Sequence, residues 1–346
     1  MRWKISLLIV IFVASSAWAG KYVAEFLEIG SGVRAAGMGN AFIAINDDPS
    51  ALWWNPASLG WIKTPQVYAM HALLYDQMYL LDAFASRFKV SKLSFGISLI
   101  RLSTDRIPFT RDDGYFDYGV DGIPGTGDQG EGNGVWDPGE PVDPSAIELR
   151  SEADYAGWLG IAARLSKKLA LGANLKIIRQ DIGGYTNLGY GSDLGAMYEG
   201  KNYRLAISLL DFPGTRLKWS TNFVENKLPT ARIGGLYQRS LWGRGISGLA
   251  AFDLEMKFEG YEDAVLGHIG DVSFDPHVGL EVSFWNVFYL RGGLDRRDLS
   301  AGAGIRLGLV RIDYAFVASS IDNVHRIGLT VNFPTKKPPR AQSPTK

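Results

Sequence analysis

Apolar residues recur at every second position from about residue 65 onward, and short turns interrupt this alternation. In residues 299–307 the apolar side chains share one face, while Ser, Gly and Arg share the other. Residues 310–316 and 325–333 repeat the pattern. Because successive side chains of a strand point to opposite sides, each segment predicts a strand with one apolar face and one polar or small face.

The alternation by itself suits two architectures. A soluble sandwich turns its apolar face inward, whereas a membrane barrel turns it outward toward lipid. Most segments are roughly nine to thirteen residues long, which favours membrane strands, because soluble strands average about five or six. Charged residues and Gly on the polar faces are typical of a wet or plugged lumen. The barrel is therefore the favoured architecture.

We predict an all-β fold, a transmembrane antiparallel β-barrel of about 14 strands, an even number as in bacterial single-chain barrels. Residues 166–168 and 200–202 predict short turns on one side, and the longer connections are expected on the extracellular side. The predicted strands span residues 66–75, 78–88, 92–102, 153–165, 169–180, 190–199, 203–211, 229–239, 246–258, 272–284, 286–294, 298–308, 309–318 and 325–333.

Many aromatic residues stand near the ends of these segments. In a membrane barrel they are expected to form girdles at the two interfaces, and the alternative is the core of a soluble fold. The residues concerned are Tyr75, Tyr79, Tyr155, Trp158, Tyr198, Tyr203, Trp242, Phe284, Trp285 and Tyr289.

The first residues predict export. Arg2 and Lys4 precede an apolar run of about ten residues, and residues 17–19 have the small-x-small pattern of a signal-peptidase site. We expect a signal peptide over residues 1–19, cleaved after Ala19; the alternative is an uncleaved anchor. No later run of about 18 uncharged apolar residues predicts a membrane helix. Residues 334–346 are rich in Pro and Lys and predict a disordered tail.

Composition agrees with this class of protein. The mature chain of about 327 residues suits one barrel. With no Cys, an exported chain has no disulfides and depends on packing and hydrogen bonds. A net charge of +0 argues against a nucleic-acid partner. The 41 Gly and 12% aromatic residues suit an outer-membrane barrel, and they also suit a large secreted β-protein.

An acidic insertion, residues 104–150, separates the third and fourth predicted strands. Its stretch from Asp112 to Asp143 holds nine acidic residues, nine Gly and no Lys or Arg. Such a loop repels itself unless a cation binds within it. The topology of alternating strands places it on the extracellular side.

Part of the insertion is similar to a calcium loop. Asp117, Asp121, Gly122 and Asp128 fall at loop positions one, five, six and twelve. Position three is Gly, position twelve is Asp instead of Glu, and no flanking helices are evident. We expect a Ca²⁺ site here; the alternative is a solvated, flexible loop. Further oxygen ligands would come from Glu131, Asn133, Asp137 and Glu140.

The sequence predicts no enzyme. The four His residues stand alone, and no nucleophile elbow, phosphate loop or zinc spacing is present. The pair Asp47-Asp48 is followed at once by Pro49, which favours a turn or helix-capping role over a catalytic carboxylate pair. No catalytic residue is therefore assigned.

Residues 20–64 form neither a clean strand nor a clean helix. Small residues around Gly37 permit close backbone packing, and Trp53, Trp54 and Pro56 would seat the segment against a wall. A barrel of about fourteen strands has a lumen wide enough to conduct or to need a plug. We expect this segment to fold into the lumen as a hatch before the barrel of residues 65–333.

The stretch GSGVRAAGMGNAFIAINDDPSALWWNPASL closely resembles the start of the PorV/PorQ family of bacterial outer-membrane proteins, which are FadL-like barrels. The family pattern is Arg-Ala-x-x-Met-Gly-x-Ala, then acidic residues, then Asn-Pro-Ala-x-Leu. The matching residues are Arg34, Ala35, Met38, Gly39, Ala41, Asp47, Asp48, Asn55, Pro56, Ala57 and Leu59.

The resemblance implies a fourteen-stranded outer-membrane barrel with an N-terminal hatch. FadL-like relatives pass hydrophobic small molecules, so transport of such molecules is the first expected function. PorV-like relatives serve type IX secretion and hold exported proteins at the cell surface, which is the second. A soluble, secreted calcium-binding β-protein is the third. The expected partners are outer-membrane lipid and either hydrophobic small molecules or exported proteins. The acidic insertion is not part of the family pattern.

Overall fold

The structure is a computed structural model that describes residues 23–110, 115–243, 245–260 and 265–334. The predicted signal peptide, Asp112, Asp113 and the tail beyond residue 334 lie outside these ranges. The chain forms two compact units, one of Met1–Leu102 with Asp154–Lys346 and one of Ser103–Ala153. Within the described residues, no helix is both long enough and apolar enough to cross a membrane.

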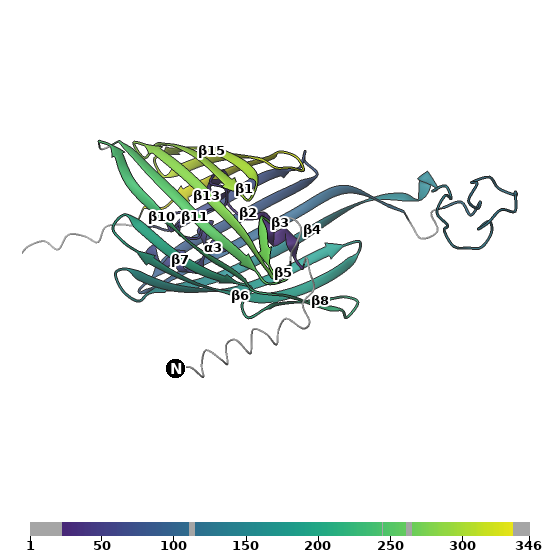
Figure 1. Cartoon of the computed structure of the whole chain (residues 1–346), viewed down its shortest axis with the longest axis horizontal. Helices are drawn as coiled ribbons and strands as arrows, with labels where there is room; N and C mark the ends of the chain where they lie inside the picture. The colour runs from purple at the N-terminus through teal and green to yellow at the C-terminus, as the bar shows by residue number, and fades with distance from the viewer. Residues whose placement is uncertain (1–22, 111–114, 244, 261–264, 335–346) are drawn as a thin grey trace, which may run out of the picture. The chain divides into compact units, whose positions relative to one another are not determined.

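The first unit is built on a closed antiparallel barrel. In the described part of the chain, fourteen strands pair with their neighbours in sequence order, and β17 pairs with β1 to close the sheet. Figure 1 shows these strands around the short purple helices of the N-terminal region. The predicted fold class is confirmed. The barrel strands are β1 (Gln66–Leu74), β2 (Tyr79–Val90), β3 (Leu93–Thr110), β4 (Ile147–Arg164), β5 (Leu169–Ile182), β6 (Tyr185–Glu199), β7 (Tyr203–Leu210), β10 (Thr230–Trp242), β11 (Ile246–Lys257), β13 (Val272–Phe284), β14 (Phe288–Asp295), β15 (Asp298–Leu307), β16 (Val310–Ala318) and β17 (Val324–Asn332).

Three short strands were not expected from the sequence. They are β8 (Thr215–Trp219), which pairs with β6, β9 (Val224–Lys227), which pairs with β8, and β12 (Gly267–Ile269), which pairs with β13. Runs of three to five residues are too short for a period of two to stand out from the surrounding loop. The other departure is the length of β3 and β4, because each continues into the acidic insertion.

The barrel walls are apolar outside and polar inside. In β5, Leu175 and Ile177 are 66% and 59% exposed, whereas Asn174 and Lys176, which alternate with them, are 1% and 4% exposed. A soluble protein has the reverse distribution, because burying unpaired charges costs several kcal/mol while exposed apolar surface is unfavourable in water. Lipid around such a barrel would remove the second cost. The prediction that the apolar face of each strand points outward is confirmed.

The predicted aromatic girdles are only partly correct. Tyr155, Tyr203 and Trp285 are exposed on the outside, as expected. Trp158 and Tyr289 are buried and face the lumen instead, because they stand at inward positions of their strands. Their bulk helps to fill a wide lumen. The side chain of Trp242 lies outside the described part.

The second unit, Ser103–Ala153, contains the outer parts of β3 and β4, the short 3-10 helix η4 (Pro144–Ala146) and an isolated bridge between Tyr115 and Val142. Most of its remaining chain forms turns.

The apolar outer face predicts that the stability cost of a Leu→Arg substitution depends on its position along a strand. Leu175→Arg, in the middle of β5, should destabilise the barrel in lipid vesicles by about 2–4 kcal/mol, because a charge at the bilayer midplane is poorly solvated. Leu307→Arg, at the last residue of β15 and similarly exposed, should cost only about 0–1 kcal/mol. The measurement is urea unfolding followed by heat-modifiable gel mobility. Equal costs, or a chain soluble without detergent, would contradict the barrel's place in lipid.

Candidate functional site

The most distinctive part of the first unit is the N-terminal segment, defined here as residues 23–62. It folds as four short helices, and nearly all of its side chains are buried. Asn55 begins the last helix by accepting a hydrogen bond from Ala57 N at 2.9 Å, and Pro56 occupies its first turn. The helices are η2 (Glu25–Ile29), α2 (Val33–Gly37), α3 (Ala51–Trp54) and η3 (Pro56–Trp61).

Arg34 is the main charged anchor of the N-terminal segment. Its guanidinium makes two hydrogen bonds to Glu281 of β13, at 2.8 and 2.6 Å, and a third to Asp47 at 2.8 Å. Arg34 and Glu281 are both buried, and a planar two-bond pair of this kind fixes orientation as well as distance. This pair therefore determines where α2 lies against the wall.

Asp47 is held in its charged form. Burial by itself would raise the pKa of the Asp47 carboxyl. The positive charges of Arg34 and, to a smaller extent, Arg204 outweigh this effect and hold the pKa of Asp47 well below its usual range. Its side chain is nevertheless 58% exposed within the lumen. Asp47 is thus a permanent anion beside water-accessible space.

Asp48 has a different environment from its neighbour. It is buried, accepts hydrogen bonds from Ser50 N at 3.0 Å and Ser50 Oγ at 2.7 Å, and pairs with Arg311 of β16. Arg311 also binds Asp313 at 2.7 Å, so the ion pairs continue along the wall. The pair Asp47-Asp48 therefore shapes a turn and anchors it, as the following proline suggested.

Backbone contacts complete the attachment. Phe42 N and Ile43 N both donate to one carboxylate oxygen of Asp253 in β11, at 2.5 and 2.9 Å. A Cβ added at Gly293 of β14 would lie 2.2 Å from Gly39 N, which no real Cβ atom tolerates. Glycine is required there because the two backbones touch.

The same holds on the opposite wall. A Cβ at Gly172 of β5 would lie 2.4 Å from Pro56 C, and one at Gly195 of β6 would lie 2.0 Å from the side-chain oxygen of Asn55. All of the motif residues thus lie in one segment that contacts strands around the barrel; they are Arg34, Met38, Gly39, Asp47, Asp48, Asn55 and Pro56. The sequence did not point to their wall partners, although a charge or Gly at an inward strand position was the available signal.

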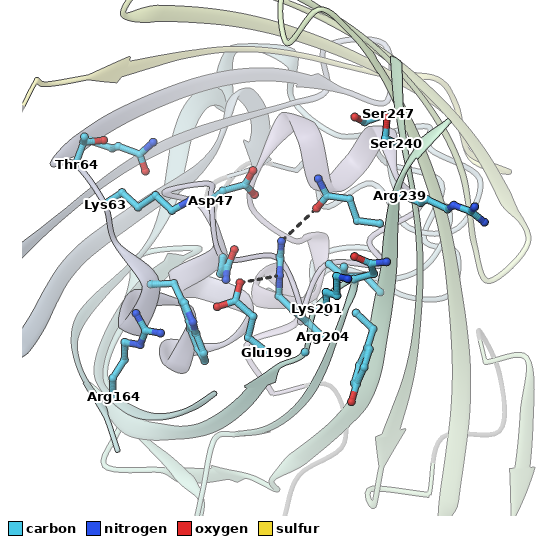
Figure 2. Close-up of a pocket in the computed structure, with 18 of the residues that line it drawn as sticks. Asp47, Lys63, Thr64, Arg164, Glu199, Lys201, Arg204, Arg239, Ser240 and Ser247 are labelled. Atoms are coloured by element: carbon cyan, nitrogen blue, oxygen red, sulfur yellow. Dashed lines mark hydrogen bonds and ion pairs between the residues drawn. The ribbon is translucent and has the colours of Figure 1, made fainter. Parts of the chain in front are cut away.

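A large polar cavity lies beside the N-terminal segment. We call it the vestibule; its volume is about 950 Å³, and it is bounded by Asn46, Asp47 and the turn Gly200–Asn202. Figure 2 shows Arg204 at its centre, linked to Glu199 and a glutamine, Gln238. The Lys and Arg residues that line it are Lys63, Arg87, Arg164, Lys201, Arg204, Arg239 and Arg306.

Two smaller cavities lie within the barrel. One of about 100 Å³ is lined by Arg34, Asp47 and Glu281 and shares residues with the vestibule. Another of about 150 Å³ is lined by Glu28, Ala36 and residues of β14, β16 and β17. The N-terminal segment therefore lines separate cavities with different parts of its chain.

An apolar depression of about 550 Å³ lies on the barrel wall. It is formed by outward Leu, Ile and Ala side chains of β4, β5, β6 and β7, together with Gly172 and Gly195. The same two glycines contact Asn55 and Pro56 on the inner face. At this place, only the strand backbone separates the N-terminal segment from the outer surface.

The acidic loop of the second unit satisfies its carboxylates internally. Its carboxylate oxygens mostly accept backbone N–H groups, and Asn133 donates to a carboxylate. The contacts are Gly132 N and Gly134 N to Asp117 (2.7 and 2.8 Å), Ile123 N to Asp121 (2.8 Å), Asp121 N to Asp128 (2.8 Å), Gly125 N and Gly127 N to Glu131, and Asn133 to Asp137 (2.6 Å).

These contacts leave calcium binding as a prediction. Among the described residues, no group of three or more His, Cys, Asp or Glu side chains is placed to hold a metal ion. The seven predicted oxygen ligands all lie in one loop, and each side chain has a hydrogen-bond partner within the protein, although Asp128 Oδ1 has none among the described residues.

No protein-family model and no curated protein sequence matches the chain. Solved structures match it in fold. The Ralstonia pickettii toluene transporter TbuX matches with a TM-score of 0.52 and 12% identity, over 88% of this chain and 99% of that chain. The P. putida toluene transporter TodX matches with a TM-score of 0.54 and 11% identity, over the same shares. The chain shares their barrel fold; the resemblance to the PorV/PorQ family stays an expectation.

The contact between the N-terminal segment and β14 predicts unequal effects at two adjacent glycines. Gly293→Ala should destabilise the protein by about 1–3 kcal/mol, because the added methyl group overlaps Gly39. Gly292→Ala is the matched control, since the nearest atom to its Cβ would be Ser300 O at 3.8 Å. The unfolding temperature in detergent, read from heat-modifiable mobility, measures both. A similar loss in both variants would show that the segment does not press on this wall.

The calcium prediction is tested on the acidic loop itself. With a dissociation constant on the order of 10⁻⁴–10⁻³ M, Ca²⁺ should protect the loop from added protease and a chelator should restore cleavage. The triple variant Asp117→Asn, Asp121→Asn, Asp128→Asn should lose the protection while heat-modifiable mobility is retained. Equal cleavage with and without Ca²⁺ would contradict the calcium site and would mean that the internal hydrogen bonds alone stabilise the carboxylates of the loop.

Proposed function

We propose that the chain is an outer-membrane transport barrel whose lumen is closed by its N-terminal segment. The observation that carries this proposal is the pairing of β17 with β1. Because the sheet closes without any residue of the N-terminal segment, the wall and the obstruction in the lumen are separate parts of the chain. The segment can therefore move while every strand keeps its hydrogen bonds.

Hydrophobic small molecules are the proposed substrates. Two proteins that share the fold are toluene transporters. The apolar depression offers a surface for such molecules, and at Gly172 and Gly195 it is backed directly by Asn55 and Pro56. If Asn55 and Pro56 moved away from the wall, the inner face of the barrel at Gly172 and Gly195 would no longer be covered by the N-terminal segment.

A reversible lock tests this function. A Cβ built on Gly37 would lie 3.6 Å from Cβ of Ala315 in β16, a spacing that suits a disulfide, and the natural chain has no Cys to interfere. In vesicles that contain the double variant Gly37→Cys, Ala315→Cys, toluene uptake should fall to the protein-free level when oxidised and return on reduction.

Controls for the lock come from the same positions. Each single cysteine variant should transport equally in both redox states. A further variant that lacks residues 30–60 should conduct ions in planar bilayers more than the natural chain does. Transport by the oxidised double variant, with the disulfide verified by mass spectrometry, would refute an opening in which the N-terminal segment moves as a whole.

A second candidate function is attachment of exported proteins at the cell surface. It is supported by the polar character of the cavities within the barrel and by the compact unit Ser103–Ala153, which the transport proposal does not use. In this role the N-terminal segment need not move. Exported proteins should then co-purify equally with the oxidised and reduced double variant, whereas transport should be absent in both.

A soluble, secreted protein is the least supported candidate. The outer faces of the barrel strands carry exposed Leu, Ile and aromatic side chains over their whole length. A continuous apolar surface of this kind would aggregate in water.

A further inference from the structure

The vestibule has an excess of positive charge that transport of hydrophobic molecules does not explain. Seven Lys or Arg residues and two acidic residues, Asp47 and Glu199, line it. Mutual repulsion among the cations costs free energy that an anion in the cavity would offset.

Two of these cations lack the carboxylate partners found elsewhere in the lumen. Arg87 is buried, and its hydrogen bonds go to neutral acceptors, Gln66 Oε1 at 2.5 Å and Asn46 O at 2.8 Å. Arg306 is partly buried; its guanidinium lies 5.6 Å from the ring centre of Tyr289, and its Nε atom has no hydrogen-bond partner among the described residues. Buried cations are normally paired with an anion. The vestibule is therefore incompletely neutralised by the chain itself.

Asp47 shows how an anion is held here. Its exposed carboxylate projects toward the vestibule and binds one nitrogen of Arg34 at 2.8 Å, while the other nitrogens of Arg34 are taken by Glu281. An exposed carboxylate is readily replaced by another one. A guanidinium fits a carboxylate or phosphate equally well.

We propose that the vestibule binds small molecules that carry a phosphate or carboxylate group, and that Asp47, whose carboxylate lines the same cavity, competes with them for the positive charge of the lining. A volume of about 950 Å³ accommodates a ligand of drug size. Its lining includes the β6–β7 turn, at the end of the barrel where residues 166–168 also form a short turn. Short turns of outer-membrane barrels face the periplasm, so the ligand would enter from that side.

The test is direct binding of phenyl phosphate to the full chain in nonionic detergent, by calorimetry. Lys63→Gln and Lys201→Gln should each weaken binding about two- to fivefold, as expected for partly exposed charges. Asp47→Asn should strengthen it by a similar factor, because the competing carboxylate is lost. Lys92→Gln is the matched control and should leave binding unchanged, since Lys92 is an exposed cation of the turn between β2 and β3 and does not line the vestibule.

Two results would overturn the proposal. The first is no binding of phenyl phosphate by the natural chain or by Asp47→Asn. The second is weakening by Lys92→Gln equal to that by Lys63→Gln, which would indicate a diffuse surface charge. Benzyl alcohol, which has the ring without the charge, should not displace phenyl phosphate.

A lipid headgroup carries the same chemistry as a free phosphate. Repeating the titration in nanodiscs with and without phosphatidylglycerol separates the two sources. Competition by this lipid would identify a headgroup as the occupant, and its absence would identify a soluble ligand; both outcomes support an anion site. The site is measured at equilibrium, so failure here would leave the disulfide-lock test of transport unaffected.

Discussion

Closure of the sheet by the pairing of β1 with β17 is the constraint on which the other features depend. In lipid, every strand must have a partner on both sides, because an unpaired backbone edge cannot bind water there. Nine residue pairs, from Gln66 opposite Asn332 to Leu74 opposite Val324, complete the ring. Once it is closed, alternate side chains must face lipid or the lumen. The apolar outer surface and the polar lumen both follow.

A polar lumen determines how the N-terminal segment can be held. An apolar plug would leave the inward charges of β11, β13 and β16 unpaired, so the segment supplies partners: Arg34 for Glu281, Asp48 for Arg311, and two N–H groups for Asp253. Buried ion pairs add little net stability, because desolvation offsets their attraction, but losing one partner is costly. They fix one position for the segment without making it a strand of the sheet.

The vestibule is the part of the lumen where, among the described residues, the N-terminal segment does not form ion pairs with the charged side chains of the wall. The N-terminal segment pairs with the charged side chains of the wall at the places where the two are in contact. Asp47 is the acidic residue of this segment that lines the vestibule. Beyond Asp47, the hydrogen bonds of Arg87 go to neutral acceptors. The acidic loop of the second unit has an excess of negative charge instead. Its own backbone stabilises this charge, since several of its glycine N–H groups donate hydrogen bonds to Asp117 and Glu131. Excess charge of one sign is thus handled differently in the two units.

The sequence by itself determined the fourteen barrel strands, because alternation is a local property that each segment carries whatever its neighbours are. It also determined the motif from Arg34 to Pro56, whose residues are close together in the chain. Only the tertiary structure decided the partners. Glu281 lies 247 residues from Arg34, and the need for glycine at 172 and 293 comes from backbones that meet only when the barrel closes. Trp158 and Tyr289 were misassigned for the same reason: which side of a strand faces the lumen is settled by the whole ring.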